Sequence, residues 1–66
     1  MMNATCAINW FRDGKSVRKT YSTFVPRVGD TIRFSKTIFG EVYEVCWCLD
    51  EDKPNRVNIG TRTLKP

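Results

Sequence analysis

The chain has 66 residues, a length that holds one small domain, and its net charge is +4. A composition of 41% hydrophobic and 27% charged residues predicts a packed core and excludes a disordered tail. No apolar run approaches the roughly 18 residues that cross a bilayer, and residues 1–7 lack the basic and long apolar regions of a signal peptide. We therefore expect residues 1–66 to form a single cytoplasmic, unprocessed domain with no membrane partner.

The first element in chain order is a predicted hairpin. Residues 4–12 alternate between two partly apolar faces, and residues 16–24 are rich in β-branched and aromatic side chains. Between them lies Asp13-Gly14, a dipeptide that tolerates positive φ and is typical of tight hairpin turns. Trp10 and Phe11 fall on opposite faces, so one of them should lie outside the core unless both faces are covered.

The register of this hairpin depends on the turn. A two-residue turn would place Trp10 opposite Val17 and Cys6 opposite Tyr21, which brings apolar residues together on one surface. A three-residue turn with a bulge would shift that register. The sequence leaves both possibilities open.

Three further strands are predicted, over residues 31–35, 41–49 and 56–61. Residues 25–30 end the hairpin, because they contain a proline, which cannot donate to a ladder, and a Gly-Asp turn pair. Residues 36–40 form a predicted loop or irregular edge whose apolar pair, Ile38 and Phe39, could protrude.

The strand over residues 41–49 shows the clearest alternation. We predict that its core face carries Tyr43, Val45, Trp47 and Leu49. Five short strands in about 60 residues cannot bury both faces of a flat sheet, so the sheet should curl and close on itself. We expect an all-β fold, a single small five-stranded antiparallel barrel of the Src-homology-3-like or OB-like type.

Two segments carry a family resemblance. Val28-Gly29-Asp30-Thr31-Ile32-Arg33-Phe34 and Gly40-Glu41-Val42-Tyr43-Glu44-Val45 resemble the entry and second strand of Src-homology-3-like barrels, and within that class a degenerate KOW motif of RNA-binding ribosomal and elongation-factor proteins. The whole chain is similar to short barrel proteins of bacteriophages, in which a Pro-x-Val-Gly-Asp entry precedes a Tyr-x-Val-x-Trp-x-Leu strand. The resemblance implies a viral accessory protein in a bacterial or phage-infected host cell, and no particular chemistry.

The three cysteines, Cys6, Cys46 and Cys48, are too few and odd in number for a disulfide-stapled secreted domain. Cys46 and Cys48 would share one face of a strand, an awkward geometry for a mutual disulfide. Without histidine or a fourth thiol, a tetrahedral zinc site would need carboxylates or another subunit. We expect the cysteines to be buried small hydrophobes in a reducing compartment, with no metal bound.

Catalysis has little support in the sequence. There is no histidine, no phosphate-cradling glycine loop, and no nucleophile and base at a recognisable spacing. The acidic run Asp50-Glu51-Asp52 lies in a predicted turn, where a solvated loop is favoured over a metal or acid-base site. We expect a protein that is not an enzyme and that has no catalytic residues and no cofactor.

Charge is distributed unevenly along the chain. Residues 1–36 contain seven Lys and Arg against two acids, a net charge of +5, while residues 37–66 contain four against five, a net charge of −1. Single-stranded DNA or RNA needs cations for its phosphates and flat rings for its bases. We therefore predict nucleic-acid binding with little sequence specificity, through phosphate contacts from Arg12, Lys15, Arg18, Lys19 and Arg33 and through the rings of Phe11 and Tyr21.

The same residue types also suit a protein partner, because aromatic and arginine side chains are enriched at interface hot spots. An extended hairpin offers an edge for strand addition, and the Ile38-Phe39 tip offers an apolar anchor. The alternative hypothesis is a phage-encoded protein-interaction module, either an inhibitor of a host protein or a particle component, that acts through its strand edges.

Overall fold

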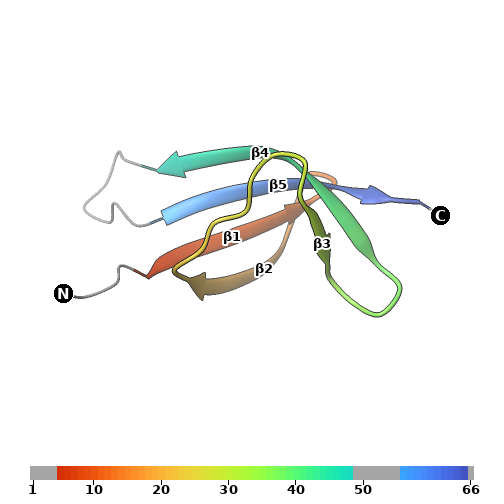
Figure 1. Ribbon diagram of the computed structural model, residues 1–66, viewed down its shortest axis with the longest axis horizontal. Coiled ribbons are helices and arrows are strands. Elements are labelled where there is room, and N and C mark those ends of the chain that lie inside the picture. The colour runs from red at the N-terminus through yellow and green to blue at the C-terminus, as the bar shows by residue number, and fades with distance from the viewer. Residues whose placement is uncertain (1–4, 49–55, 66) are drawn as a thin grey trace.

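The computed structural model describes residues 5–48 and 56–65 (Figure 1). These residues form five strands: β1 (Cys6–Arg12), β2 (Lys15–Ser22), β3 (Thr31–Arg33), β4 (Phe39–Cys48) and β5 (Arg56–Leu64). Neither described segment contains a helix, and so none that could span a membrane. The predicted all-β, five-stranded fold is confirmed. The predicted strand ends at Ala4 and Leu49 and the acidic turn lie outside the described residues.

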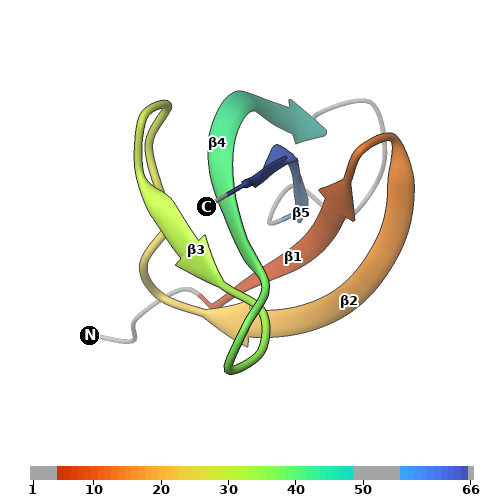
Figure 2. The ribbon, with the colours of Figure 1, turned by 90° about the vertical axis from the view of Figure 1, so that its right-hand side faces the viewer.

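The five strands form one strongly curled sheet in the order β2-β1-β5-β4-β3 (Figure 2). Three neighbouring pairs are antiparallel, but β1 and β5 run parallel. The predicted barrel-like fold is confirmed, but the prediction of antiparallel strands is wrong for the pair of β1 and β5, because side-chain alternation reports the face of a residue and not the direction of its strand. The sheet is a half-barrel, with β2 and β3 as its two edges.

The core lies on the inner face of this half-barrel. Ile8, Val42, Val57 and Ile59 are each at most 1% exposed, and Cys6 is also buried. Ile8 pairs with Val57 across the parallel ladder, so β1 and β5 bring their apolar side chains together. Burial of each such side chain contributes about 1.5–3 kcal/mol.

The Asp13-Gly14 turn is of the two-residue type. Arg12 pairs with Lys15, and Asp13 and Gly14 have φ angles of 53° and 87°, as a type I′ turn requires. The register expected for a two-residue turn nevertheless holds only as far as Phe11, because a bulge between Trp10 and Phe11 inserts one extra residue, Val17.

The pairs that result from this bulge are Trp10 with Arg18 and Cys6 with Ser22. The side chains of Thr20 and Arg18 therefore lie on the same face of the hairpin as Trp10. This places polar groups on the inner face of β2, where the predicted register had apolar ones.

A second bulge lies in β4, between Val42 and Glu44. It leaves Val42 buried and Val45 half-buried, while the extra residue Tyr43 turns outward and is 40% exposed. Trp47 is 49% exposed although its strand partner is the buried Val57. The predicted core face of β4 is therefore correct for Val45 and Trp47, although Trp47 is only half covered, and wrong for Tyr43.

Turn chemistry fixes the connection from β2 to β3. The amide of Asp30 donates to the carbonyl of Arg27 at 3.0 Å, and Gly29 has a φ of 100°. The Asp30 carboxylate accepts the Arg27 amide at 2.8 Å, and the amide of Gly29 donates to the carbonyl of Val42 at 2.8 Å. The Gly-Asp pair therefore closes a turn and docks it on β4.

The predicted apolar tip between β3 and β4 is not formed by Ile38 and Phe39. Phe39 begins β4 and pairs with Arg33 and Leu64, and Ile38 is half-buried, with its carbonyl accepting the amide of Phe34 at 2.8 Å. The protruding bend is residues 35–37, which are exposed. Phe39 is thus a strand residue and not a loop tip, although its side chain remains 36% exposed.

Asp13 ties the hairpin turn to the end of β5. Its amide donates to the carbonyl of Thr61 at 2.9 Å, and its carboxylate accepts the amide of Thr63 at 3.0 Å and the hydroxyl of Thr63 at 2.5 Å. These two bonds from Thr63, with smaller contributions from Arg12 and Lys65, lower the pKa of Asp13.

A carboxyl group with a lowered folded-state pKa stabilises the fold above its unfolded pKa, near 3.8. That contribution disappears as the pH falls through the folded-state pKa. We therefore expect Asp13→Asn, which keeps the tolerance of positive φ, to lose less stability on acidification than the unsubstituted protein. The measurement is the urea midpoint as a function of pH, which should fall less steeply below about pH 4 in the variant. Parallel plots for the two proteins would contradict the role given to Asp13.

Candidate functional site

The open side of the half-barrel contains a groove of about 140 Å³ between the edges β2 and β3. We call it the edge groove. Its lining comes from β1, β2, β3 and the residue after β3, and consists of Trp10, Arg18, Thr20, Ile32, Arg33 and Phe34.

Two aromatic rings form the floor of the edge groove. Trp10 and Phe34 meet edge to face, with ring centroids 6.2 Å apart and planes at 88°. The indole N–H of Trp10 donates to the hydroxyl of Thr20 at 2.7 Å, which fixes the orientation of the indole. Both rings are half-buried, so each still presents surface to the groove.

Phe34 can reach this position because Gly40 has no side chain. A Cβ on Gly40 would lie 2.9 Å from the Phe34 ring and 3.2 Å from the Cβ of the buried Thr61. The ring therefore packs directly on the backbone of β4. A glycine here serves close packing and not an unusual backbone angle.

Three arginines surround the two rings. The guanidinium carbon of Arg12 lies 5.4 Å from the Phe34 ring centroid, and Arg18 and Arg33 line the groove itself. The Nε of Arg33 donates to the carbonyl of Ser35 at 3.3 Å. The partner of Arg12 is an aromatic ring and the partner of Arg33 is a carbonyl group. Neither is an acid, so these contacts leave the positive charge of the edge groove in place.

The structure brings together only part of the predicted site. Arg12, Arg18 and Arg33 meet at the edge groove. Lys19 lies on the outer face of β2, with its ammonium 5.9 Å from the Tyr21 ring centroid, and Lys15 is exposed beside the turn. Phe11 lies on the outer face of β1, together with Tyr43. The predicted site residues are thus divided between two faces of the sheet, because neighbouring strand residues point in opposite directions.

Sequence reasoning did not place Trp10 and Phe34 in the candidate site, because it chose Phe11 and Tyr21 as the rings that would meet a base. Trp10 and Phe34 face inward, but toward an open groove and not into a closed core. The signal was the polar character of Arg18 and Thr20: a charged and a hydroxyl side chain at alternate positions indicate that this face of β2 is not packed in a core.

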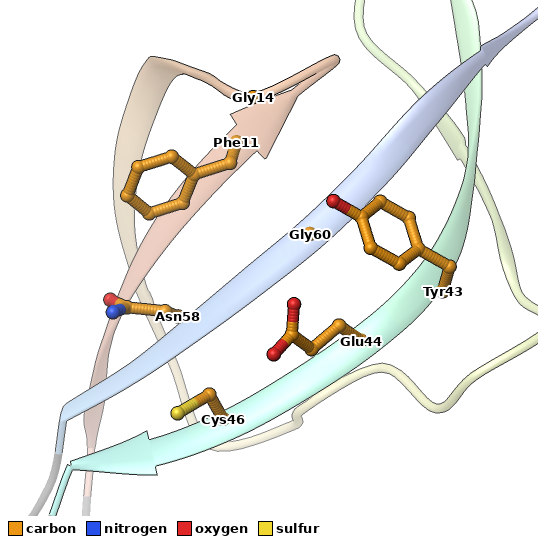
Figure 3. Close-up of a pocket in the computed structure, with 7 residues that line it drawn as sticks. All are labelled: Phe11, Gly14, Tyr43, Glu44, Cys46, Asn58 and Gly60. Carbon is orange, nitrogen blue, oxygen red and sulfur yellow. The ribbon is translucent and has the colours of Figure 1, made fainter.

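A second depression, of about 260 Å³, lies on the outer face of the sheet. We call it the outer-face pocket. Its lining residues come from β1, the hairpin turn, β4 and β5 and are Phe11, Gly14, Tyr43, Glu44, Cys46, Asn58 and Gly60 (Figure 3). The expectation of buried cysteines is therefore confirmed for Cys6 and wrong for Cys46, which is exposed.

Comparison with protein-family models, with curated proteins and with solved structures finds no match to this chain. Function is therefore inferred from the two sites alone.

The packing of Phe34 on Gly40 generates a prediction about the edge groove. Gly40→Ala should lower the free energy of unfolding by about 1–3 kcal/mol, because the added methyl group overpacks the contact. The double variant Gly40→Ala with Phe34→Leu should recover part of this loss, and urea denaturation of all four proteins measures the coupling. Strictly additive effects would show that the two residues do not touch.

Proposed function

We propose that this protein binds single-stranded nucleic acid in the edge groove. Phosphates contact Arg12, Arg18 and Arg33, and a base packs against the exposed surface of Trp10 and Phe34. The observation that carries the proposal is that two arginines and two half-buried aromatic rings line one concave site, with the guanidinium of a third arginine, Arg12, over one of the rings.

Each part of the edge groove suits one part of a polynucleotide. Guanidinium groups bind phosphate through two parallel hydrogen bonds and remain charged at any physiological pH. A base that stacks on an aromatic ring gains about 1–3 kcal/mol regardless of its identity. These contacts engage the backbone and the base face and not the base edges, so binding in the groove has little sequence specificity.

The size of the edge groove favours a single strand over a duplex. At about 140 Å³ it accommodates one ring at a time, next to Trp10 and Phe34. The faces of bases in a duplex are stacked on their neighbours, so they are not accessible to such a groove. A single strand presents these faces at no unpairing cost.

The test is fluorescence anisotropy with a labelled dT oligonucleotide over a range of salt concentrations. We expect Arg18→Gln to weaken binding several-fold and to reduce the slope of log K against log salt by about 1, because one phosphate contact is lost. Lys15→Gln is the matched control, since it removes one charge from the same strand outside the edge groove. Absence of binding at low salt, or equal effects of the two variants, would contradict the proposal.

A second candidate function is favoured by the unpaired edges. Since β2 and β3 end the sheet, each has one side on which no strand pairs within the described chain. Such an edge accepts an extended segment of a protein partner, as expected of a phage-encoded interaction module. A stoichiometric, nuclease-resistant partner that protects β2 amides from hydrogen exchange would favour this candidate. Unchanged exchange in β2 on binding would exclude it.

A further inference from the structure

We propose that the outer-face pocket is a binding site for a guanine base, supplied either as a free nucleotide or within a single strand. The pocket lies on the face of the sheet opposite the edge groove, since its floor residue Gly60 alternates with the buried Ile59 and Thr61. Binding here therefore does not depend on the function proposed for the edge groove.

The floor of the pocket is the backbone of Gly60, which is itself buried. Gly60 has no side chain, and in Figure 3 the rings of Phe11 and Tyr43 lie on either side of it. The Tyr43 ring packs against Gly60, since a Cβ there would lie 3.1 Å from its Cζ atom. The guanidinium of Arg62 lies 4.5 Å from the Tyr43 ring centroid and holds that ring from another side. A planar ligand can therefore lie in the pocket between the side chains of Phe11 and Tyr43, beside the glycine that the Tyr43 ring covers.

The polar groups of the pocket are a hydrogen-bond acceptor and a donor. Glu44 pairs with Gly60 across the ladder, and Figure 3 shows its carboxylate turned toward that glycine. An ionised carboxylate only accepts hydrogen bonds. The Oδ1 of Asn58 accepts a hydrogen bond from the Nδ2 of Asn9 at 3.1 Å. The side-chain N–H₂ of Asn58 is therefore the group that can donate to a ligand.

Guanine is the base whose edges match this pair of groups. Its N1–H and N2–H₂ donors form two hydrogen bonds to a carboxylate such as that of Glu44. Its O6 and N7 atoms, along the adjoining edge, accept from an amide such as that of Asn58. Adenine and cytosine would present an acceptor nitrogen to the Glu44 carboxylate, and uracil would present only one donor between two carbonyl oxygens. With any of those three bases, polar groups of the base and of the pocket would lose water on binding without gaining a hydrogen bond.

The experiment titrates the protein with GMP, AMP, CMP and UMP, followed by the ¹H–¹⁵N spectrum, and then compares dT oligonucleotides with and without one central dG. We expect GMP to bind at least tenfold more tightly than the other nucleotides, or the dG oligonucleotide to bind at least tenfold more tightly than plain dT. The first result identifies a site for the free nucleotide. The second identifies a site for guanine within a strand.

The decisive variant is Glu44→Gln, which replaces one acceptor oxygen by a donor. It should abolish the guanine preference, whereas Glu41→Gln, the same charge change on the same strand, should leave it intact. Equal thermal midpoints of the two variants show that folding is unaffected. Binding of plain dT oligonucleotide tests the edge groove separately and should survive Glu44→Gln. No preference for guanine in either format, or a preference that survives Glu44→Gln, would overturn the inference.

Discussion

The structure depends on the pairing of β5 between β1 and β4. The hairpin of β1 and β2 and the pair of β3 and β4 are held in one sheet only because β5 forms a parallel ladder with the first and an antiparallel ladder with the second. Its inward side chains Val57, Ile59 and Thr61 are fully buried, and the Thr61 hydroxyl donates to the carbonyl of Phe11 at 2.8 Å. The side chains of β5 thus fill the middle of the core. Its backbone N–H and C=O groups form ladder hydrogen bonds with the strands on both sides.

With β5 in the middle of the sheet and β1 and β4 on either side of it, β2 and β3 are the two edges. The half-barrel stays open between these edges. A closed barrel would cover Trp10 with apolar side chains from β2. Here the bulge at Val17 instead places Arg18 opposite Trp10, and Thr20 binds the indole N–H. The same topology that joins the two halves therefore creates a polar, cationic groove with aromatic rings on its floor.

Much of the fold could be predicted from the sequence. A tight hairpin turn at Asp13-Gly14 and the five strands follow from local rules of turn chemistry and alternation. The parallel pairing of β1 with β5 and the bulges at Val17 and Tyr43 could not be predicted, because each depends on contacts between residues distant in the chain. Those features decide which face each aromatic residue takes, so the predicted site includes the arginines of the edge groove but not the two rings beside them.

The two tryptophans test, within one spectrum, the claim that a single strand of nucleic acid occupies the edge groove. Trp10 lies in the groove with its indole N–H on Thr20, whereas Trp47 lies on β4 outside the groove. On addition of a dT oligonucleotide to ¹⁵N-labelled protein, the indole resonance of Trp10 should shift strongly while that of Trp47 stays in place. A strand that binds while shifting Trp47 and leaving Trp10 unchanged would contradict the claim.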